Sequence, residues 1–304
     1  MVNTVGTAGR STRASPGVVL ELLKPITWFA PMWAYACGVI SSGQSLSIHW
    51  MGAIGGVILA GPLICGCSQA VNDWFDRHVD AINEPQRPIP SGRIPGRWGL
   101  YIALIWTLLS AGFAWLLGPW VFVAGLVGLA LAWAYSAPPL RLKMNGWWGN
   151  AAVGACYEGL PWFTGAAAVS AALPDPKIIT LAVLYSIGAH GIMTLNDFKA
   201  VEGDRQLGIR SLPAALGVER AAWVACVVMA LPQVVVVGLL LSWDRLWFAG
   251  GVGVLLAAQI ALMPWLMAKP KERAAPYNGT GVLFYVLGML VSAFAVRGLM
   301  TGGY

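Results

Sequence analysis

Long apolar stretches constrain the fold of this chain more than any other feature, because they recur along nearly its whole length. Hydrophobic residues make up 58% of the 304 residues and charged residues only 11%, whereas a soluble domain carries roughly 25% charged residues. A helix that crosses a bilayer needs about 20 apolar residues. We therefore predict an all-α integral membrane protein with nine transmembrane helices around a central cavity. The expected spans are residues 25–42, 50–72, 98–117, 119–136, 150–171, 177–196, 219–241, 246–267 and 279–299.

The distribution of basic residues predicts how these helices are oriented. If the N-terminus is cytoplasmic, sixteen of the nineteen lysines and arginines fall on the cytoplasmic side, and only Lys177, Arg245 and Arg297 fall on the other side. An excess of basic residues marks the cytoplasmic loops of membrane proteins, so the C-terminus is expected to be periplasmic. No polar linker divides the chain. We expect one membrane domain over residues 21–304 and a flexible cytoplasmic tail over residues 1–20.

Two short acidic segments interrupt the apolar pattern in the same way. The first is "NDWFDRHVD" at residues 72–80, after the second expected span, and the second is "NDFKAVEGD" at residues 196–204, after the sixth. Both follow the frame Asn-Asp-x-x-Asp-x-x-x-Asp, except that Ala200 stands at the middle position of the second copy, with Glu202 nearby. The shared frame suggests two equivalent helical units that face each other on the cytoplasmic side.

Helical geometry places these carboxylates on a common face. Offsets of 0, 3 and 7 residues fall within about 60° of arc on an α-helix, so Asp73, Asp76 and Asp80 form one stripe if their helix continues that far. Asp197 and Asp204 repeat the stripe. Like charges this close repel each other, and carboxylates are costly beside hydrocarbon. Mg²⁺ relieves both penalties, and it typically binds one or two carboxylates together with substrate phosphates. The alternatives are a solvated acidic loop, a polar cavity or an ion-transport site.

A polyprenyl diphosphate is the substrate class that suits such a site. Its anionic head binds Mg²⁺, and its tail belongs among apolar helices. A metal ion stabilises the charge on the leaving diphosphate, and aromatic rings stabilise the allylic cation that remains. Arginine and lysine donors also suit phosphate oxygens, although basic residues at cytoplasmic helix ends serve equally as membrane anchors.

The acidic segments resemble the motifs of a known family. "NDWFDRHVD" and "NDFKAVEGDRQLGIRSL" resemble the two aspartate-rich motifs of the UbiA-type intramembrane prenyltransferase superfamily. The runs "DAINEPQRPIPSG", "SGRIPGRWGLYIA", "YEGLPWFTGAA" and "GAHGIMTLNDFKA" are similar to its chlorophyll synthase branch. With the nine expected spans, the resemblance covers nearly the whole chain. It implies the UbiA-type fold and the Mg²⁺-dependent transfer of a geranylgeranyl or phytyl group from its diphosphate to the propionate of bacteriochlorophyllide a.

The resemblance also implies roles for individual residues. The residues expected to bind Mg²⁺ and to be catalytic are Asp73, Asp76, Asp80, Asp197 and Asp204. The second motif is expected to supply fewer ligands because of Ala200, unless Glu202 assists. The residues expected to bind substrate are Asn72, Arg77, Arg87, Tyr135, Arg141, Lys143, Glu158, Asn196 and Lys199. Arg77 lies off the acidic stripe, and we expect it to pair with a carboxylate or a phosphate across the cavity.

Two further polar residues inside the expected spans, Glu158 and His190, are candidates for a function. Glu158 is an intramembrane carboxylate, a feature that usually marks a functional site. It is expected to hold the tetrapyrrole, to orient a basic side chain or to be a protonated, hydrogen-bonded residue. His190 precedes Asp197 by seven residues and lies on the same helical face. It either approaches the magnesium of the pigment ring or is a hydrogen-bonded packing residue.

Other functions remain open at this stage. Within the superfamily, the alternatives are a plant-type chlorophyll synthase and a prenyltransferase acting on a quinone precursor or haem. Outside it, the alternatives are a membrane carrier and a pigment-assembly scaffold. The resemblance implies a bacterial intracytoplasmic photosynthetic membrane, with the active site facing the cytoplasm. Its expected partners are the bilayer and other pigment-biosynthesis or antenna-assembly proteins, and no nucleic acid.

Overall fold

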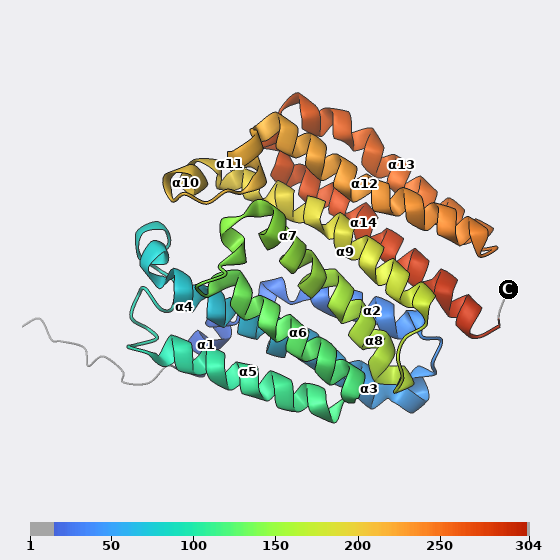
Figure 1. The fold of residues 1–304 in the computed structure, drawn as a ribbon, viewed down its shortest axis with the longest axis horizontal. Helices are drawn as coiled ribbons and strands as arrows, with labels where there is room; N and C mark the ends of the chain where they lie inside the picture. The colour runs from blue at the N-terminus through green and yellow to red at the C-terminus, as the bar shows by residue number, and fades with distance from the viewer. Residues whose placement is uncertain (1–14, 303–304) are drawn as a thin grey trace, which may run out of the picture.

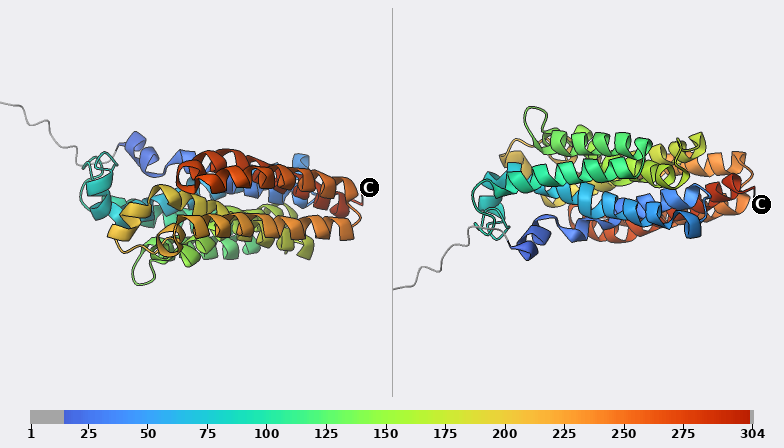
Figure 2. Two further views of the ribbon diagram at one scale, coloured as in Figure 1. Left: turned by 90° about the horizontal axis from the view of Figure 1, so that it is seen from above. Right: turned by 90° about the horizontal axis from the view of Figure 1, so that it is seen from below.

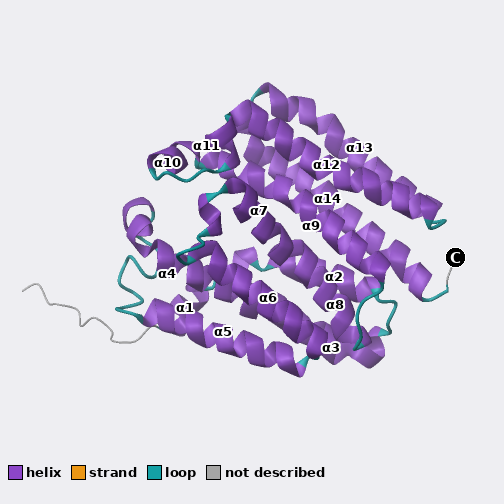
Figure 3. Cartoon of the chain, in the orientation of Figure 1, coloured by secondary structure: helices purple, strands orange, loops and turns teal. Residues whose placement is uncertain are grey.

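The computed structural model describes residues 15–302, and this part of the chain consists of helices and connecting loops (Figure 3). Among these residues there is no β-strand, only an isolated bridge between Asn145 and Arg210. The long helices run side by side in one bundle (Figure 1). The elements are α1 (Pro16–Leu22), η1 (Pro25–Thr27), α2 (Phe29–Ser41), α3 (Leu46–Ile58), η2 (Leu59–Cys65), α4 (Gly66–Asn83), α5 (Trp98–Leu116), α6 (Pro119–Ser136), η3 (Leu142–Met144), α7 (Gly146–Gly154), η4 (Ala155–Gly159), α8 (Leu160–Ser170), α9 (Pro176–Asn196), η5 (Asp197–Lys199), α10 (Val201–Gln206), α11 (Leu212–Leu216), α12 (Val218–Ser242), α13 (Leu246–Ala268) and α14 (Pro270–Met300).

Seven helices of the described region are long and apolar enough to cross a membrane. The other two predicted spans are helical but do not reach that measure. Residues 25–42 contain η1 and the 13-residue α2, and residues 150–171 are divided among α7, η4 and α8. The predicted all-helical architecture is therefore confirmed, and seven of the nine predicted spans correspond to candidate membrane spans in the described region.

The outer surface of the bundle is apolar, as a bilayer requires. Leu108 is 73% exposed, Trp115 65% and Trp247 89%. Exposed apolar surface of this extent is rare on soluble monomers. It supports a membrane location for the bundle.

The expected tail over residues 1–20 lies mostly outside the described residues. Its last residues belong to α1, which begins at Pro16. Leu22 and Leu23, at the end of α1, are buried against α4 and its neighbours. The N-terminal segment thus packs onto the helix that carries the first acidic motif.

Two π-helical turns interrupt the bundle, and such turns often occur at functional sites. η2 contains Pro62, which has no N–H to donate to the helix. η4 contains Glu158 and is followed by Pro161 in α8. Each turn contributes residues to a pocket described below.

Small residues allow α2 and α8 to pack backbone to backbone. A Cβ added at Gly38 would lie 2.0 Å from the carbonyl oxygen of Trp162, and one at Gly165 would lie 2.1 Å from that of Tyr35. Close packing through glycine is typical of membrane helices. Trp162 and Tyr35 themselves are fully buried.

The two acidic motifs lie at the same end of the molecule. The end of α4, together with α10 and α11, projects from the end of the bundle opposite the C-terminus (Figures 1 and 2). α9 leads into the second motif and is the most buried of the candidate spans, at 56%. The fold thus brings segments more than a hundred residues apart to one polar end.

Candidate active site

The first acidic motif lies on a continuous helix, as the predicted stripe requires. α4 extends to Asn83, so Asp73, Asp76 and Asp80 all belong to it. Asp73 is fully buried and Asp80 is 6% exposed. Asn72, on the same helix, donates to Asp76 Oδ2 at 3.0 Å and to Ser136 Oγ of α6 at 3.2 Å.

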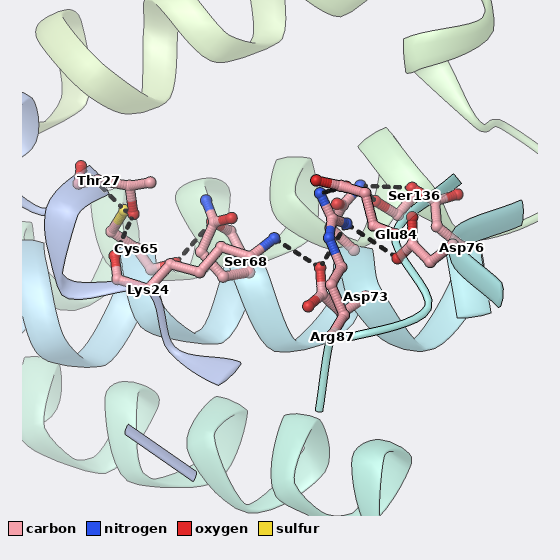
Figure 4. A network of polar contacts seen from close by, with 12 residues as sticks. Lys24, Thr27, Cys65, Ser68, Asp73, Asp76, Glu84, Arg87 and Ser136 are labelled. Carbon is pink, nitrogen blue, oxygen red and sulfur yellow. Dashed lines mark hydrogen bonds and ion pairs between the residues drawn. The ribbon is translucent and has the colours of Figure 1, made fainter. Parts of the chain in front are cut away.

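The aspartates of this motif are each paired with a basic side chain, and Figure 4 shows Lys24 and Arg87 directed toward Asp73. Lys24 Nζ lies 2.7 Å from Asp73 Oδ1. Arg87 Nη1 lies 3.3 Å from the same oxygen and 2.9 Å from Asp80 Oδ2. Lys143 pairs with Asp76, and Arg141 Nη2 lies 3.9 Å from it. The second oxygen of Asp73, Oδ2, is buried and has no hydrogen-bond partner in the described chain.

The second motif is held by neutral donors instead. Asn150 Nδ2 lies 3.2 Å from Asp197 Oδ2, and Ser211 Oγ donates to Asp204 Oδ2 at 2.5 Å. Within residues 15–302, neither aspartate forms a salt bridge. Burial raises the pKa of Asp204, and the hydrogen bond from Ser211 opposes that shift. These carboxylates therefore lack the cationic partners that the first motif has.

The prediction of a continuous second stripe is wrong. α9 ends at Asn196, η5 follows, and Ala200 leaves the helical conformation with φ −110° and ψ 4° before α10 begins. Asp204 lies on the separate short helix α10, where its N–H donates to Ala200 O at 2.8 Å. The short side chain of Ala200 lies at the break.

One polar pocket of about 400 Å³ joins the two motifs. The predicted site residues that line it are Asn72, Asp76, Asp80, Tyr135, Arg141, Lys143, Asn196, Asp197, Lys199 and Asp204. Asp73 and Arg87 do not line it but pair with each other beside it. Burial lowers the pKa of Lys143, and the charge of Asp76 opposes that shift.

Three predicted residues lie elsewhere. Arg77 donates to Trp74 O at 2.6 Å and stacks over the Trp74 ring, so it does not reach a carboxylate across the cavity as expected. Glu202 is exposed and pairs with Lys271 at 2.6 Å, so it does not complete the second motif. Glu158 lines a separate apolar pocket, discussed below.

His190 has a packing environment. Its Nε2 lies 3.2 Å from Trp147 O, and its ring lies against that of Trp147, with centroids 5.4 Å apart. This arrangement favours the packing alternative that the sequence left open.

Sequence reasoning missed three residues of the site. Lys24, Asn150 and Ser211 contact Asp73, Asp197 and Asp204 respectively. Lys24 is 49 residues from its partner and Asn150 is 47. No local pattern marks these two, since the packing of α1 on α4 and of α7 on α9 brings them close. Ser211 lies only seven residues after Asp204.

The donor set fits Mg²⁺ only with a phosphate ligand. In the described region, no group of three or more His, Cys, Asp and Glu side chains is placed to hold a metal ion. Mg²⁺ is commonly bound through one or two carboxylates and substrate phosphates. Asp197 and Asp204, which line the pocket without a cationic partner, supply such a pair.

An apolar pocket of about 200 Å³ adjoins the polar one. The two share Asn72 and Tyr135. The apolar pocket continues among η2, α6 and η4, where Ile64, Leu131 and Tyr157 line it. A ligand with a charged head and a hydrocarbon tail can therefore occupy both pockets at once.

Comparison with known proteins points to a family whose members transfer prenyl groups. Residues 25–288 match the model of the UbiA prenyltransferase family. The chain is 59% identical to the bacteriochlorophyll synthase 33 kDa chain of Cereibacter sphaeroides, over 93% of this chain and 94% of the relative. It is 41% identical to the chloroplastic chlorophyll synthase of Oryza sativa, over 91% of this chain and 76% of that protein. A UbiA homologue from Archaeoglobus fulgidus, solved with DMAPP and Mg²⁺, has the same fold, with a TM-score of 0.71 and 21% identity over 90% of this chain and 98% of that one.

Proposed function

The chain belongs to the UbiA prenyltransferase family, and we propose that it transfers a geranylgeranyl or phytyl group from its diphosphate to the propionate carboxylate of bacteriochlorophyllide a. The observation that carries the chemistry is the polar pocket, where two acidic motifs and basic side chains meet beside an apolar pocket. The acceptor is supported by the relative from Cereibacter sphaeroides, at 59% identity, against 41% for the chloroplastic chlorophyll synthase.

The residues of the polar pocket suit a diphosphate head. Asp197 and Asp204 would hold Mg²⁺, which when bound supplies positive charge that stabilises the leaving diphosphate. Lys143 and Arg141 line the pocket and donate to phosphate oxygens when these replace Asp76. Arg87 neutralises Asp73 and Asp80 beside the pocket. The proposal is supported by the A. fulgidus homologue of the same fold, which was solved with DMAPP and Mg²⁺.

The transfer itself needs few protein groups. A propionate oxygen forms the new bond to the allylic C1, the bond from C1 to the diphosphate oxygen breaks, and its electron pair leaves with diphosphate. The carboxylate is already a competent nucleophile, so no general base is required. Tyr135 lines both pockets, at the point where the head meets the tail. Its ring stabilises positive charge on the allylic carbon.

The membrane arrangement belongs to the same proposal. α2 and the divided helix α7–α8 complete nine spans, with the N-terminus cytoplasmic, the C-terminus periplasmic and the polar pocket at the cytoplasmic face. The membrane is the intracytoplasmic photosynthetic membrane of a bacterium, as the bacterial relative suggests. The basic residues of the polar end support this orientation.

Ester formation tests the proposal. Purified protein in lipid would receive Mg²⁺, geranylgeranyl diphosphate and an equal mixture of bacteriochlorophyllide a and chlorophyllide a, and the esters would be resolved by chromatography. We expect ester mainly from bacteriochlorophyllide and none with chelator. Preference for chlorophyllide would overturn the acceptor assignment, and the absence of either ester from folded protein would overturn the reaction.

A further inference from the structure

A second apolar pocket lies beside α7 and adjoins the apolar pocket of about 200 Å³, which is called the tail pocket below. It has a volume of about 570 Å³, within the range of about 300–1,000 Å³ typical of small-molecule sites. η1, α2, α9 and α14 surround it. Phe29 and Leu283 line it and are 59% and 52% exposed, so it opens on the side of the bundle.

This side pocket meets both pockets of the proposed reaction. It shares Asn196 with the polar pocket, and Val153, Tyr157 and Met193 with the tail pocket. A molecule in the side pocket can therefore present one end to the polar pocket. Asn278 stands at this junction, where its Nδ2 donates to Asn196 Oδ1 at 2.8 Å.

Glu158 is the unusual residue of the side pocket. It is only 5% exposed, and its Oε2 has no hydrogen-bond partner in the described chain. No basic side chain of residues 15–302 forms an ion pair with it. A buried carboxyl without a partner is costly, and it lies in the π-helical turn η4, a type of turn often found at functional sites. The side chain is therefore placed for a polar partner that a ligand supplies.

A prenyl tail cannot be that partner, because it has no group that hydrogen-bonds. A ring acceptor with a polar substituent can. If the ring occupies the side pocket, its polar substituent meets Glu158 while a carboxylate elsewhere on the molecule reaches Asn196. Asn278 Oδ1, which also has no partner in the described residues, lines the same pocket.

We propose that Glu158 is a positioning residue for the acceptor, hydrogen-bonding a polar substituent of a planar, largely apolar ring so that its carboxylate faces the polar pocket. This inference rests on the proposed function, since it presupposes a carboxylate acceptor. Glu158 does not touch the reacting atoms. Its loss therefore weakens acceptor binding while leaving prenyl diphosphate binding intact.

The test compares Glu158→Met, which keeps the length but removes hydrogen bonding, with Glu158→Gln, which keeps hydrogen bonding. For Glu158→Met we expect the KM for bacteriochlorophyllide to rise about tenfold, the size of effect that follows when a buried polar partner is removed. The KM for geranylgeranyl diphosphate should not change. Glu158→Gln should restore most of the acceptor affinity.

Gln233→Leu is the matched control. Gln233 is also buried with an oxygen, Oε1, that lacks a partner in the described chain, but it pairs with Gln259 between α12 and α13 and lines none of these three pockets. Its folded variant should keep both KM values. Glu158→Ala gives a second reading if Glu158→Met does not fold.

The outcomes distinguish a failure of this inference from a failure of the proposed function. Ester from the wild type with an unchanged acceptor KM in the Glu158 variants overturns this inference and leaves the proposed function standing. A rise in the KM for the prenyl diphosphate instead would assign the side pocket to the tail and also overturn it. No ester from the wild type overturns the proposed function itself.

Discussion

The two acidic motifs differ in their partners, and this difference organises the site at the scale of residues. Asp73, Asp76 and Asp80 are paired with Lys24, Lys143 and Arg87, respectively. The aspartates of the second motif accept hydrogen bonds from neutral side chains. A bound cation would therefore stabilise the carboxylates of the second motif most, because no basic side chain in the described part of the chain forms a salt bridge with them. At the first motif, Lys143 and Arg141 line the polar pocket beside Asp76, where they are positioned to exchange its carboxylate for a phosphate.

Asp73→Asn tests the first motif. The amide keeps the shape of the side chain but removes the charge that holds Lys24 and Arg87. We expect turnover to fall at least about 100-fold, equivalent to about 2.7 kcal/mol in the barrier. Gel filtration and ester formation would be measured on the same preparation. Normal turnover in folded protein would remove Asp73 from the mechanism.

Asp204→Asn, with Glu202→Gln as its control, tests the second motif. Asp204 lines the polar pocket, whereas Glu202 is exposed and pairs with Lys271. Even outer contacts of a metal ligand change metal affinity by about 10–100-fold, so Asp204→Asn should raise the Mg²⁺ concentration for half-maximal turnover about tenfold or more. Glu202→Gln should leave it unchanged. The opposite ranking would show that the ligand is Glu202.

At the scale of elements, the sequence predicts what depends on local periodicity. The spacing of Asp73, Asp76 and Asp80 predicts a common face only if the helix continues past the expected span end at residue 72, and α4 does continue to Asn83. The break at Ala200 was not predictable, because the same spacing is compatible with a continuous helix. Lys24 and Asn150 were equally out of reach, since tertiary packing alone brings them to their aspartates. Arg77 was misplaced because Trp74, one turn earlier, holds it.

The packing of α2 on α8 gives a stability prediction. A Cβ at Gly38 would lie 2.0 Å from a backbone oxygen that cannot move freely, so Gly38→Ala should destabilise the protein by about 1–3 kcal/mol or more. Gly112→Ala in α5 meets nothing within 4 Å and should be neutral or stabilising by up to about 1 kcal/mol. Thermal unfolding in one detergent would compare them. Equal midpoints would contradict the close approach of α2 and α8.

At the scale of the whole molecule, three adjoining pockets match the three parts of the proposed substrates. The polar pocket at one end of the bundle suits the diphosphate, the inner apolar pocket suits the tail, and the side pocket suits the acceptor. Tyr157 and Asn196 lie where these pockets meet. The proposed reaction requires that the acceptor supplies the nucleophile and that the prenyl group is transferred as an electrophile.

The fate of the acceptor's oxygens tests that requirement most directly. Bacteriochlorophyllide a labelled with ¹⁸O in both propionate oxygens would be incubated with the protein, Mg²⁺ and geranylgeranyl diphosphate, and the ester analysed by mass spectrometry. If the carboxylate attacks the allylic carbon, both labelled oxygens remain in the ester. Loss of one labelled oxygen would mean that the acid, rather than the prenyl group, is activated, and would contradict the account.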